Sequence, residues 1–370
     1  MGNRQLFGVE KAATLLQDLI DVKKIPGLAI TVAKENTVRF QKGYGHTNLE
    51  NQTPVNPKTT VFRIASVSKP IAATALAHMV AEKKIALDAS FYSYVPYYPK
   101  KEWDFTIRQL ASHTAGIRGY KGMEYGLNKP YSIKESIAIF KDDDLLFKPG
   151  TSYHYNSFDW VLISLAMQEV CGIPFEDYVM EKVLKPLGMI NTFSETMTSA
   201  SLSHQEEERS LSVVNKSQSH QEERLLSVAE VSKFYSRNKL GFREAIPVNN
   251  FYKLAGGGYL STTEDIVKLG QAYLENRILN DEVLNQFITS ENIEGKPTYY
   301  GLGWQVSEDK NGKPYYGHIG NGVGGYSNFY VYPKEKLVIS ILVNCTNPNI
   351  QEVLDEVIAI FVSGKDKAIS

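Results

Sequence analysis

Residues 60–83 read TVFRIASVSKPIAATALAHMVAEK. The first five, residues 60–64, are mostly β-branched or aromatic, which predicts a short strand. From residue 66 onward apolar residues recur at helical spacing and predict a helix over 66–83. The residues on this apolar face are Ile71, Ala75, Leu76, Met79 and Val80. A strand that leads directly into a helix places residue 66 at the N-terminus of that helix.

The first turn of this helix contains Ser66 and Lys69. A spacing of three places both side chains on the same helix face. A serine hydroxyl is a weak nucleophile until a nearby group takes its proton, and free backbone N–H groups at a helix N-terminus favour developing negative charge. The spacing therefore fits an activated serine. By itself it also fits a helix-capping serine followed by a surface lysine.

Two further segments carry candidate chemistry. Residues 149–157, PGTSYHYNS, form a turn followed by a tyrosine-rich stretch, and a tyrosine held near ammonium groups can act as a base. Residues 317–325, GHIGNGVGG, combine a strand edge with glycines that let a ligand approach the backbone. The structural alternatives are tyrosines packed under the next helix and an ordinary hairpin with a core histidine.

The order of predicted elements indicates an α/β (α+β) fold. A helix over 9–22 and two strands over 28–33 and 37–43 open the chain. Helices dominate the middle, at 106–113, 132–141, 158–171, 175–184 and 262–275. Strands at 300–306, 313–319, 326–332 and 336–343 and a helix at 350–362 close it. We therefore expect one antiparallel sheet built from residues 1–60 and 276–370 and flanked by the terminal helices, with residues 61–275 as an inserted, mostly helical lobe. The site would lie between the lobes.

One tract departs from this order. Residues 196–232 are polar, and within them SHQEEERSLSV (203–213) and SHQEERLLSV (219–228) are near copies. Two short units are too few for a solenoid. We expect a solvated loop or exposed helix, with a lid or partner-binding arm as the alternative. His204 and His220 lack a second ligand at helical spacing, so no metal site is expected there.

Composition narrows the function classes. Lys and Arg number 40 and Asp and Glu number 41, for a formal net charge of −1, and 43% of residues are hydrophobic. Basic residues do not outnumber acidic ones, so the chain has no excess positive charge to bind a phosphate backbone. Nucleic acid is therefore not an expected partner. The two cysteines predict neither a metal site nor a disulfide framework. No membrane span or export signal is predicted, so the sequence as written predicts a cytoplasmic protein, or a periplasmic or secreted one if a signal was trimmed.

The three segments resemble the three motifs of a known family. Ser66-x-x-Lys69, the Pro-Gly-Thr…Tyr155 segment and the His318-x-Gly320 segment occur in the order found in serine β-lactamases of class C, D-Ala-D-Ala carboxypeptidases and β-lactamase-like esterases. Three supporting segments, LASHTAGI (110–117), KPLGM (185–189) and GGGYLST (256–262), also fit this family. The resemblance covers about residues 10–360, interrupted by the duplicated tract.

The resemblance implies a β-lactamase/transpeptidase-like fold and an acyl-enzyme mechanism without metal or cofactor. Ser66 would attack a carbonyl group, and Lys69 and Tyr155 would share general-base and proton-shuttle duty. The backbone N–H groups of Ser66 and Asn321 would form the oxyanion hole, and the His318–Gly320 strand would border the substrate.

Two departures bear on the substrate. The family pattern Tyr-x-Asn corresponds to Tyr155-Asn156-Ser157, which places Ser157 where the family has asparagine. His318-Ile319-Gly320 replaces Lys-Thr-Gly, and a histidine is a weaker carboxylate anchor than lysine at neutral pH. Hydrolysis of esters or peptides is therefore favoured over hydrolysis of penicillins, which carry such a carboxylate.

The sequence thus predicts a serine hydrolase that cleaves an ester or amide (peptide) bond through an acyl-Ser66 intermediate, acting on a small-molecule or peptide acyl substrate. One alternative is a true β-lactamase or D-Ala-D-Ala carboxypeptidase. An alternative of another class is a catalytically weak relative that binds peptides or cell-wall fragments.

Overall fold

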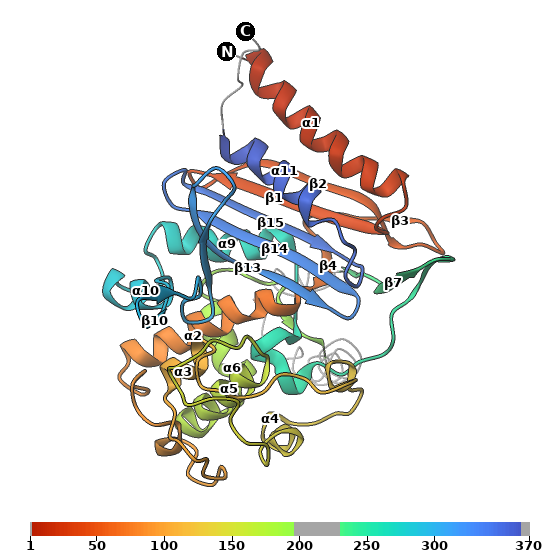
Figure 1. The fold of residues 1–370 in the computed structure, drawn as a ribbon. Helices are drawn as coiled ribbons and strands as arrows, with labels where there is room; N and C mark the ends of the chain where they lie inside the picture. Colours follow the sequence, from red (N-terminus) through yellow and green to blue (C-terminus); the bar gives the residue numbers. More distant parts are fainter. Residues whose placement is uncertain (1, 196–229, 364–370) are drawn as a thin grey trace, which may run out of the picture.

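The central feature of the fold is a seven-stranded antiparallel sheet. The computed structural model describes residues 2–195 and 230–363 (Figure 1). The strand order is β12-β13-β14-β15-β1-β2-β3. The strands are β1 (Gly27–Lys34), β2 (Thr37–Asn48), β3 (Thr53–Pro54), β12 (Gln305–Glu308), β13 (Pro314–Gly322), β14 (Gly325–Tyr332) and β15 (Leu337–Val343). β1 pairs with β15 from Leu28 opposite Val343 to Lys34 opposite Leu337, which confirms the predicted sheet built from both ends of the chain.

The two faces of this sheet are covered by different helices. α1 (Gly2–Asp21) and α11 (Gln351–Ser363) lie on one face, and α9 (Thr263–Leu274) lies on the other (Figure 1). Alternation along β1 explains this: Leu28, Ile30 and Val32 belong to the core under α1 and α11, whereas Ala29 and Ala33 belong to the core on the opposite side. Successive strand residues point to opposite faces, so one strand serves both cores.

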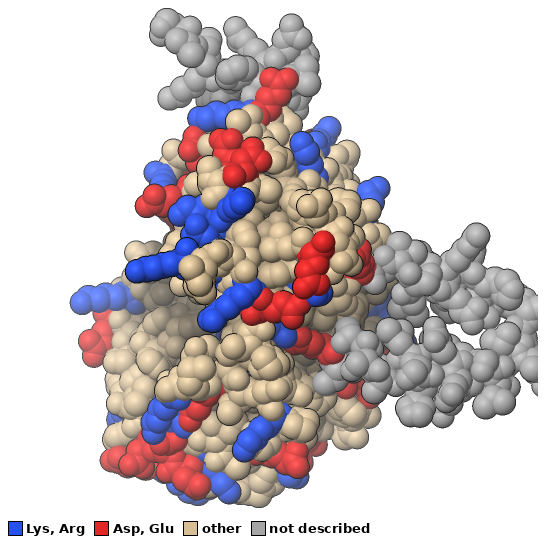
Figure 2. Space-filling model, turned by 90° about the vertical axis from the view of Figure 1, so that its right-hand side faces the viewer, with Lys and Arg blue, Asp and Glu red and all other residues tan. Residues whose placement is uncertain are grey.

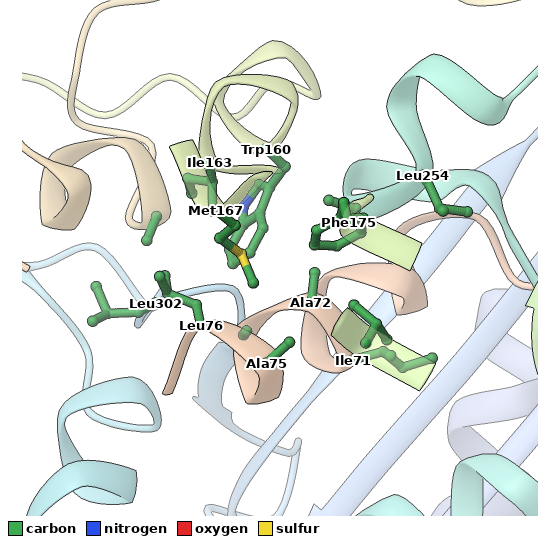
Figure 3. Packing of buried hydrophobic residues seen from close by; sticks show 14 of the residues in the cluster. Ile71, Ala72, Ala75, Leu76, Trp160, Ile163, Met167, Phe175, Leu254 and Leu302 are labelled. Atoms are coloured by element: carbon green, nitrogen blue, oxygen red, sulfur yellow. The ribbon is translucent and has the colours of Figure 1, made fainter. Parts of the chain in front are cut away.

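The helical part packs against the second face. It contains α2 (Ser68–Ala81), α3 (Ile107–Ala111), α4 (Ile133–Ser136), α5 (Phe158–Cys171), α6 (Phe175–Val179) and α10 (Asp281–Phe287). α2 is buried almost all round, and its Ala72 and Leu76 lie with Trp160 and Met167 of α5 in one apolar cluster (Figure 3). A helix that is apolar on every side belongs in a protein interior. Lys69 in the first turn of α2, and Ser66 in the one-turn segment Ala65–Val67 directly before α2, therefore stand on a packed core.

A second, small sheet connects the two parts. It has the order β5-β9-β4-β6, from β5 (Phe193–Ser194), β9 (Tyr259–Ser261), β4 (Thr60–Arg63) and β6 (Glu230–Val231). β4 runs antiparallel to β9, with Phe62 opposite Ser261 and Arg63 opposite Leu260. This pairing brings the glycine-rich segment before β9 next to the serine that follows β4.

Most predicted elements are present, with differences at their ends. The strand expected over 300–306 is wrong over its first five residues, since β12 begins only at Gln305. Gly303 adopts a φ of +83°, and a side chain on Gly301 would meet the carbonyl oxygen of Phe287, so this stretch forms a turn packed on neighbouring backbone.

The expected lobe boundary at residue 275 remains a prediction, and α9, which precedes it, packs on the sheet. The duplicated tract lies outside the described residues except for its last three, 230–232. Cys171 and Cys345 are free thiols.

Within the described part of the chain no single helix is both long and apolar enough to cross a membrane. One pair of helical segments, Phe158–Cys171 and Phe175–Leu184, passes the same test together but is bent by 83°.

The contact between α9 and the sheet gives a test of packing. A Cβ on Gly270 would lie 2.5 Å from Cγ1 of Val338 and 3.0 Å from Cγ2 of Val331. Overpacking of this kind costs about 1–3 kcal/mol, whereas alanine gains at most about 1 kcal/mol in helix propensity over glycine. We expect Gly270→Ala to lower the free energy of unfolding by about 1–2 kcal/mol in urea denaturation. Gln271→Ala on the same helix is the control and should stay within about 0.5 kcal/mol of wild type; an equal effect of both changes would contradict the tight contact.

Candidate active site

The turn between β4 and α2 is held in an uncommon conformation. Ala65, directly before Ser66, has a φ of +44°. A left-handed backbone conformation is unfavourable for a residue with a Cβ, so such a residue adopts it only where its surroundings enforce it. Two hydrogen bonds do so here: Ile64 N–H donates to the carbonyl of Tyr259, and Ser327 Oγ donates to the carbonyl of Ile64 at 2.6 Å. The turn is thus anchored to β9 on one side and to β14 on the other.

Gly320 on β13 allows the sheet to approach this turn closely. A Cβ at this position would lie 2.5 Å from the carbonyl oxygen of Ile64 and 3.0 Å from the backbone nitrogen of Ser66. Such distances exclude any side chain. The glycine in the His-x-Gly motif therefore serves to bring the edge of β13, including Asn321, against the candidate nucleophile.

The three predicted catalytic side chains meet at one point. Lys69 Nζ lies 3.1 Å from Ser66 Oγ, and the Tyr155 hydroxyl donates to the same Oγ at 2.7 Å. Lys69 Nζ also donates to the carbonyl of Gly256 at 2.7 Å and lies 4.7 Å from the centroid of the Tyr155 ring. A serine oxygen between an amine and a phenol has the arrangement of an activated nucleophile.

Burial sets the proton affinity of Lys69. The side chain is fully buried, and desolvation lowers the pKa of its ammonium group to about 7; the charge of Asp159 opposes this shift and that of Lys253 adds to it. The ordinary pKa of a lysine is 10.5. At neutral pH a substantial fraction of Lys69 is therefore a neutral amine with a lone pair that can accept a proton.

Tyr155 differs from Lys69 in this respect. The residue as a whole is 37% exposed, and its hydroxyl group donates to Ser66 Oγ. Burial raises the pKa of this hydroxyl, and the hydrogen bond to Ser66 only partly offsets the effect. Tyr155 is therefore a neutral phenol at neutral pH and acts as a hydrogen-bond donor.

Ser66 opens into a pocket of about 300 Å³. Ser157 and Asn321, both predicted site residues, line it together with Ser66. Asn156 turns away from the pocket: its amide donates to Asp159 Oδ2 at 2.7 Å and to the backbone carbonyls of Ile117 and His154. The structure thus brings Ser66, Lys69, Tyr155, Ser157, Gly320 and Asn321 to one place.

The ring of His318 is not brought to the wall of this pocket. It is buried, its Nε2 lies 2.9 Å from the Tyr300 hydroxyl, and its Nδ1 lies 2.7 Å from the carbonyl oxygen of Ile319. Because a carbonyl can only accept, Nδ1 carries the hydrogen and Nε2 accepts from Tyr300. Burial lowers the pKa of His318 to about 3, and the charge of Lys69 adds to this shift. The ring is therefore neutral and already paired.

A buried polar cluster lies behind Tyr155. His113 Nδ1 is 2.8 Å from Asp159 Oδ2, and the His113 ring lies 4.6 Å from that of Tyr155. Burial lowers the pKa of His113 and raises that of Asp159. His113 is thus part of the support of the site, and Asp159 is a further member that the sequence analysis missed. Its position three residues after Asn156, in the first turn of a predicted helix, was the available signal.

Lys253 and Arg63 are further pocket residues that sequence reasoning missed. Arg63 Nε donates to Glu195 at 2.9 Å, and its Nη1 donates to the carbonyl of Val323 at 2.8 Å. Lys253 Nζ donates to the carbonyl of Tyr125 at 2.8 Å. The only sequence signal for Lys253 is its place three residues before the Gly256–Gly258 run. Across residues 2–195 and 230–363 no group of three or more His, Cys, Asp or Glu is arranged to hold a metal ion.

The fold agrees with what comparison with known proteins shows. Residues 12–362 match the beta-lactamase family, so the chain belongs to that family. This confirms the resemblance predicted from the motifs.

Among curated proteins, the chain is similar to the human serine beta-lactamase-like protein LACTB, mitochondrial, with 26% identity over 427 aligned positions that cover 88% of this chain and 72% of that protein. Among solved structures, it is similar to the octameric penicillin-binding protein homologue from Pyrococcus abyssi (TM-score 0.76, 24% identity, 96% of this chain and 77% of that one). It is also similar to the D-amino acid amidase from Ochrobactrum anthropi (TM-score 0.76, 18% identity, 96% and 99%). These likenesses confirm the predicted fold.

The burial of Lys69 predicts a pH dependence of stability. Between the folded pKa of about 7 and the unfolded value of 10.5, the unfolded chain binds more protons than the folded one, so stability rises with pH. We expect wild type to gain about 2 kcal/mol of unfolding free energy relative to Lys69→Met between pH 7 and pH 9 in urea. The comparison with the variant cancels the other titrating groups. Parallel pH profiles of the two proteins would show that Lys69 keeps an ordinary pKa.

Proposed function

We propose that the protein is a serine hydrolase that cleaves an ester or amide bond through an acyl-Ser66 intermediate. The observation that carries this proposal is the position of Ser66 Oγ, which lies 3.1 Å from Lys69 Nζ and 2.7 Å from the Tyr155 hydroxyl, on a serine that lines a pocket. Its expected substrate is a small-molecule or peptide acyl donor.

In the first half of the reaction, neutral Lys69 accepts the proton of Ser66 as Oγ attacks the substrate carbonyl carbon. The backbone N–H groups of Ser66 and Asn321 stabilise the negative charge on the carbonyl oxygen. The leaving group departs with a proton that originates from Lys69 and passes through the Tyr155 hydroxyl. In the second half, water attacks the acyl group, its proton goes to Lys69, and Ser66 is released with its hydroxyl restored.

The assignment of Lys69 rather than Tyr155 as the base follows from their opposite pKa shifts. An efficient base has a pKa near the operating pH. The pKa of Lys69 is about 7, while burial moves the pKa of Tyr155 upward from 10.0. Formation of a phenolate in this site is unfavourable, so Tyr155 acts as a relay and donor.

The pairing of His318 bears on the choice of substrate. Its neutral, hydrogen-bonded ring offers no cation to a carboxylate at the β13 edge, and Ile319 supplies no hydroxyl. This supports ester or peptide hydrolysis over the alternative of a true β-lactamase or D-Ala-D-Ala carboxypeptidase. The close contacts of Ser66 support an enzyme over the other alternative, a catalytically weak peptide- or cell-wall-binding relative.

Covalent labelling tests the nucleophile. We expect a fluorophosphonate to add one label to wild type by intact-protein mass spectrometry, and Ser66→Ala to lose both the label and about a thousandfold or more in ester turnover. Ser68→Ala is the matched control because Ser68 Oγ is buried and accepts from Tyr259 N–H; it should remain labelled. An activated short-chain ester, a chromogenic cephalosporin and a D-Ala-D-Ala peptide would identify the subclass. Labelling of Ser66→Ala equal to that of wild type would refute the proposal.

The pH dependence of turnover tests the base. If neutral Lys69 is required, kcat/KM rises with an apparent pKa of about 7 and falls about fiftyfold from pH 7 to pH 5. Tyr155→Phe keeps the ring over Lys69 and should slow turnover by about a hundredfold or more without moving this limb. If kcat/KM instead rose with an apparent pKa near 10, and this rise disappeared in Tyr155→Phe, the base would be the tyrosine.

A further inference from the structure

Lys253 is a buried cation in the pocket of the candidate nucleophile. It ends the short segment Phe251–Lys253 and is only 9% exposed. Its Nζ donates to the carbonyl of Tyr125 at 2.8 Å and lies 5.2 Å and 5.6 Å from the ring centroids of Tyr120 and Tyr252. An ammonium group has three N–H donors, so one carbonyl and two ring faces leave much of its hydrogen-bonding capacity unused.

The charges around the pocket do not neutralise Lys253. The second cation, Arg63, pairs with Glu195, whose other oxygen accepts from the amide of Asn250 at 3.1 Å. Among the described residues no carboxylate lies within 4.0 Å of Lys253 Nζ. Glu195 acts on it only at longer range. Within residues 2–195 and 230–363, Lys253 is therefore a pocket cation without a directly paired anion.

An unpaired cation is costly to bury, and an apolar side chain of the same length would avoid that cost. Burial lowers the pKa of Lys253 to about 8, with the charge of Arg63 adding to the shift. Most of the Lys253 population is still charged at neutral pH. An anion bound beside it would supply the missing partner and gain a strong, charge-assisted hydrogen bond.

On one face of the molecule, the charged side chains of the outer surface are of mixed sign. On the face shown in Figure 2, Lys and Arg side chains alternate with Asp and Glu, without a large area of one sign. The local feature that favours an anionic substrate is Lys253 inside the pocket.

Lys253 and Ser66 line the same cavity of about 300 Å³, a volume at the lower end for small-molecule sites. We infer that Lys253 forms a carboxylate-binding subsite, and that the preferred acyl donor carries a carboxylate on its acyl chain. The subsite lies on the segment before Gly256, not on β13, where the family resemblance would place a carboxylate anchor. The part of this inference that concerns hydrolysis rests on the proposed function.

A matched pair of substrates tests the inference by turnover. The mono-para-nitrophenyl ester of adipic acid and para-nitrophenyl hexanoate have acyl chains that end in a carboxylate and a methyl group, respectively. We expect wild type to prefer the adipate ester in kcat/KM, and Lys253→Met to reduce that preference about tenfold or more. An unchanged preference overturns the inference.

Lys101→Met is the control. Lys101 also donates from Nζ to backbone carbonyls, those of Lys141 and Asp143, but lies outside the pocket, and its removal should leave the preference as in wild type. If Lys253 acted only by changing the pKa of Lys69, Lys253→Met would slow the hydrolysis of both esters equally. It would also shift the pH at which kcat/KM falls on the acid side. That result also overturns the subsite.

Direct binding separates this inference from the proposed function. Calorimetry with adipate on Ser66→Ala needs no turnover, and we expect binding there that weakens about tenfold or more in Ser66→Ala/Lys253→Met. Absent binding, or equal binding to both variants, overturns the subsite. If neither ester is hydrolysed but adipate binds as expected, the hydrolase proposal fails and the subsite stands.

Discussion

The close approach of strand β13 to the turn before α2 fixes the geometry of the whole site. It depends on the missing side chain at Gly320, since a Cβ there would collide with the carbonyl of Ile64. The hydroxyl of Ser327 fastens the same carbonyl to the sheet, and these contacts hold Ala65 in a left-handed conformation that costs on the order of 1–3 kcal/mol. The position of Ser66 is thus fixed by a seven-stranded sheet with helices on both faces, and not by a free loop. A rigid scaffold of this kind keeps reacting groups within hydrogen-bonding distance at little further entropic cost.

The burial of Lys69 connects the stability of the fold to its chemistry. An ammonium group enclosed by protein loses its hydration, and the protein returns only part of that through the carbonyl of Gly256 and the hydroxyl of Ser66. The same loss lowers the pKa of the amine toward neutrality. The folded state is therefore less stable than it would be with an apolar residue at this position, but a neutral amine is present at neutral pH, as the proposed mechanism requires. The link to Gly256 also joins α2 to the segment before β9, so the base holds together two parts of the chain that lie 187 residues apart.

The sequence was informative wherever a local pattern sufficed. The family resemblance implied that Ser66, Lys69 and Tyr155 would meet. β-rich segments bounded by turn residues predicted the strands β1 and β15, and their places at the two ends of the chain predicted that they belong to one sheet. The same reasoning extended the strand at 300–306 too far, because Gly303 bends the backbone to fit against Trp160, a contact visible only in three dimensions. It also gave no role to Lys253 or Asp159. Their importance comes from burial beside other charges, and residue type and spacing do not report desolvation.

Lys69 donates a hydrogen bond to the backbone carbonyl of Gly256. This contact bears on Ser157, the serine that stands where the family has an asparagine. Asn156 is held by Asp159 and by two backbone carbonyls, so its amide is committed to supporting the site. The carbonyl of Gly256 is instead a hydrogen-bond acceptor for Lys69. A carbonyl accepts and never donates, so it keeps one N–H of Lys69 directed toward itself whether the amine is charged or neutral. When the amine is neutral, its lone pair is then free to face Ser66 Oγ at 3.1 Å. An asparagine amide could present either its oxygen or its nitrogen, and a backbone carbonyl removes that ambiguity. Orientation of the base therefore does not require an asparagine at position 157.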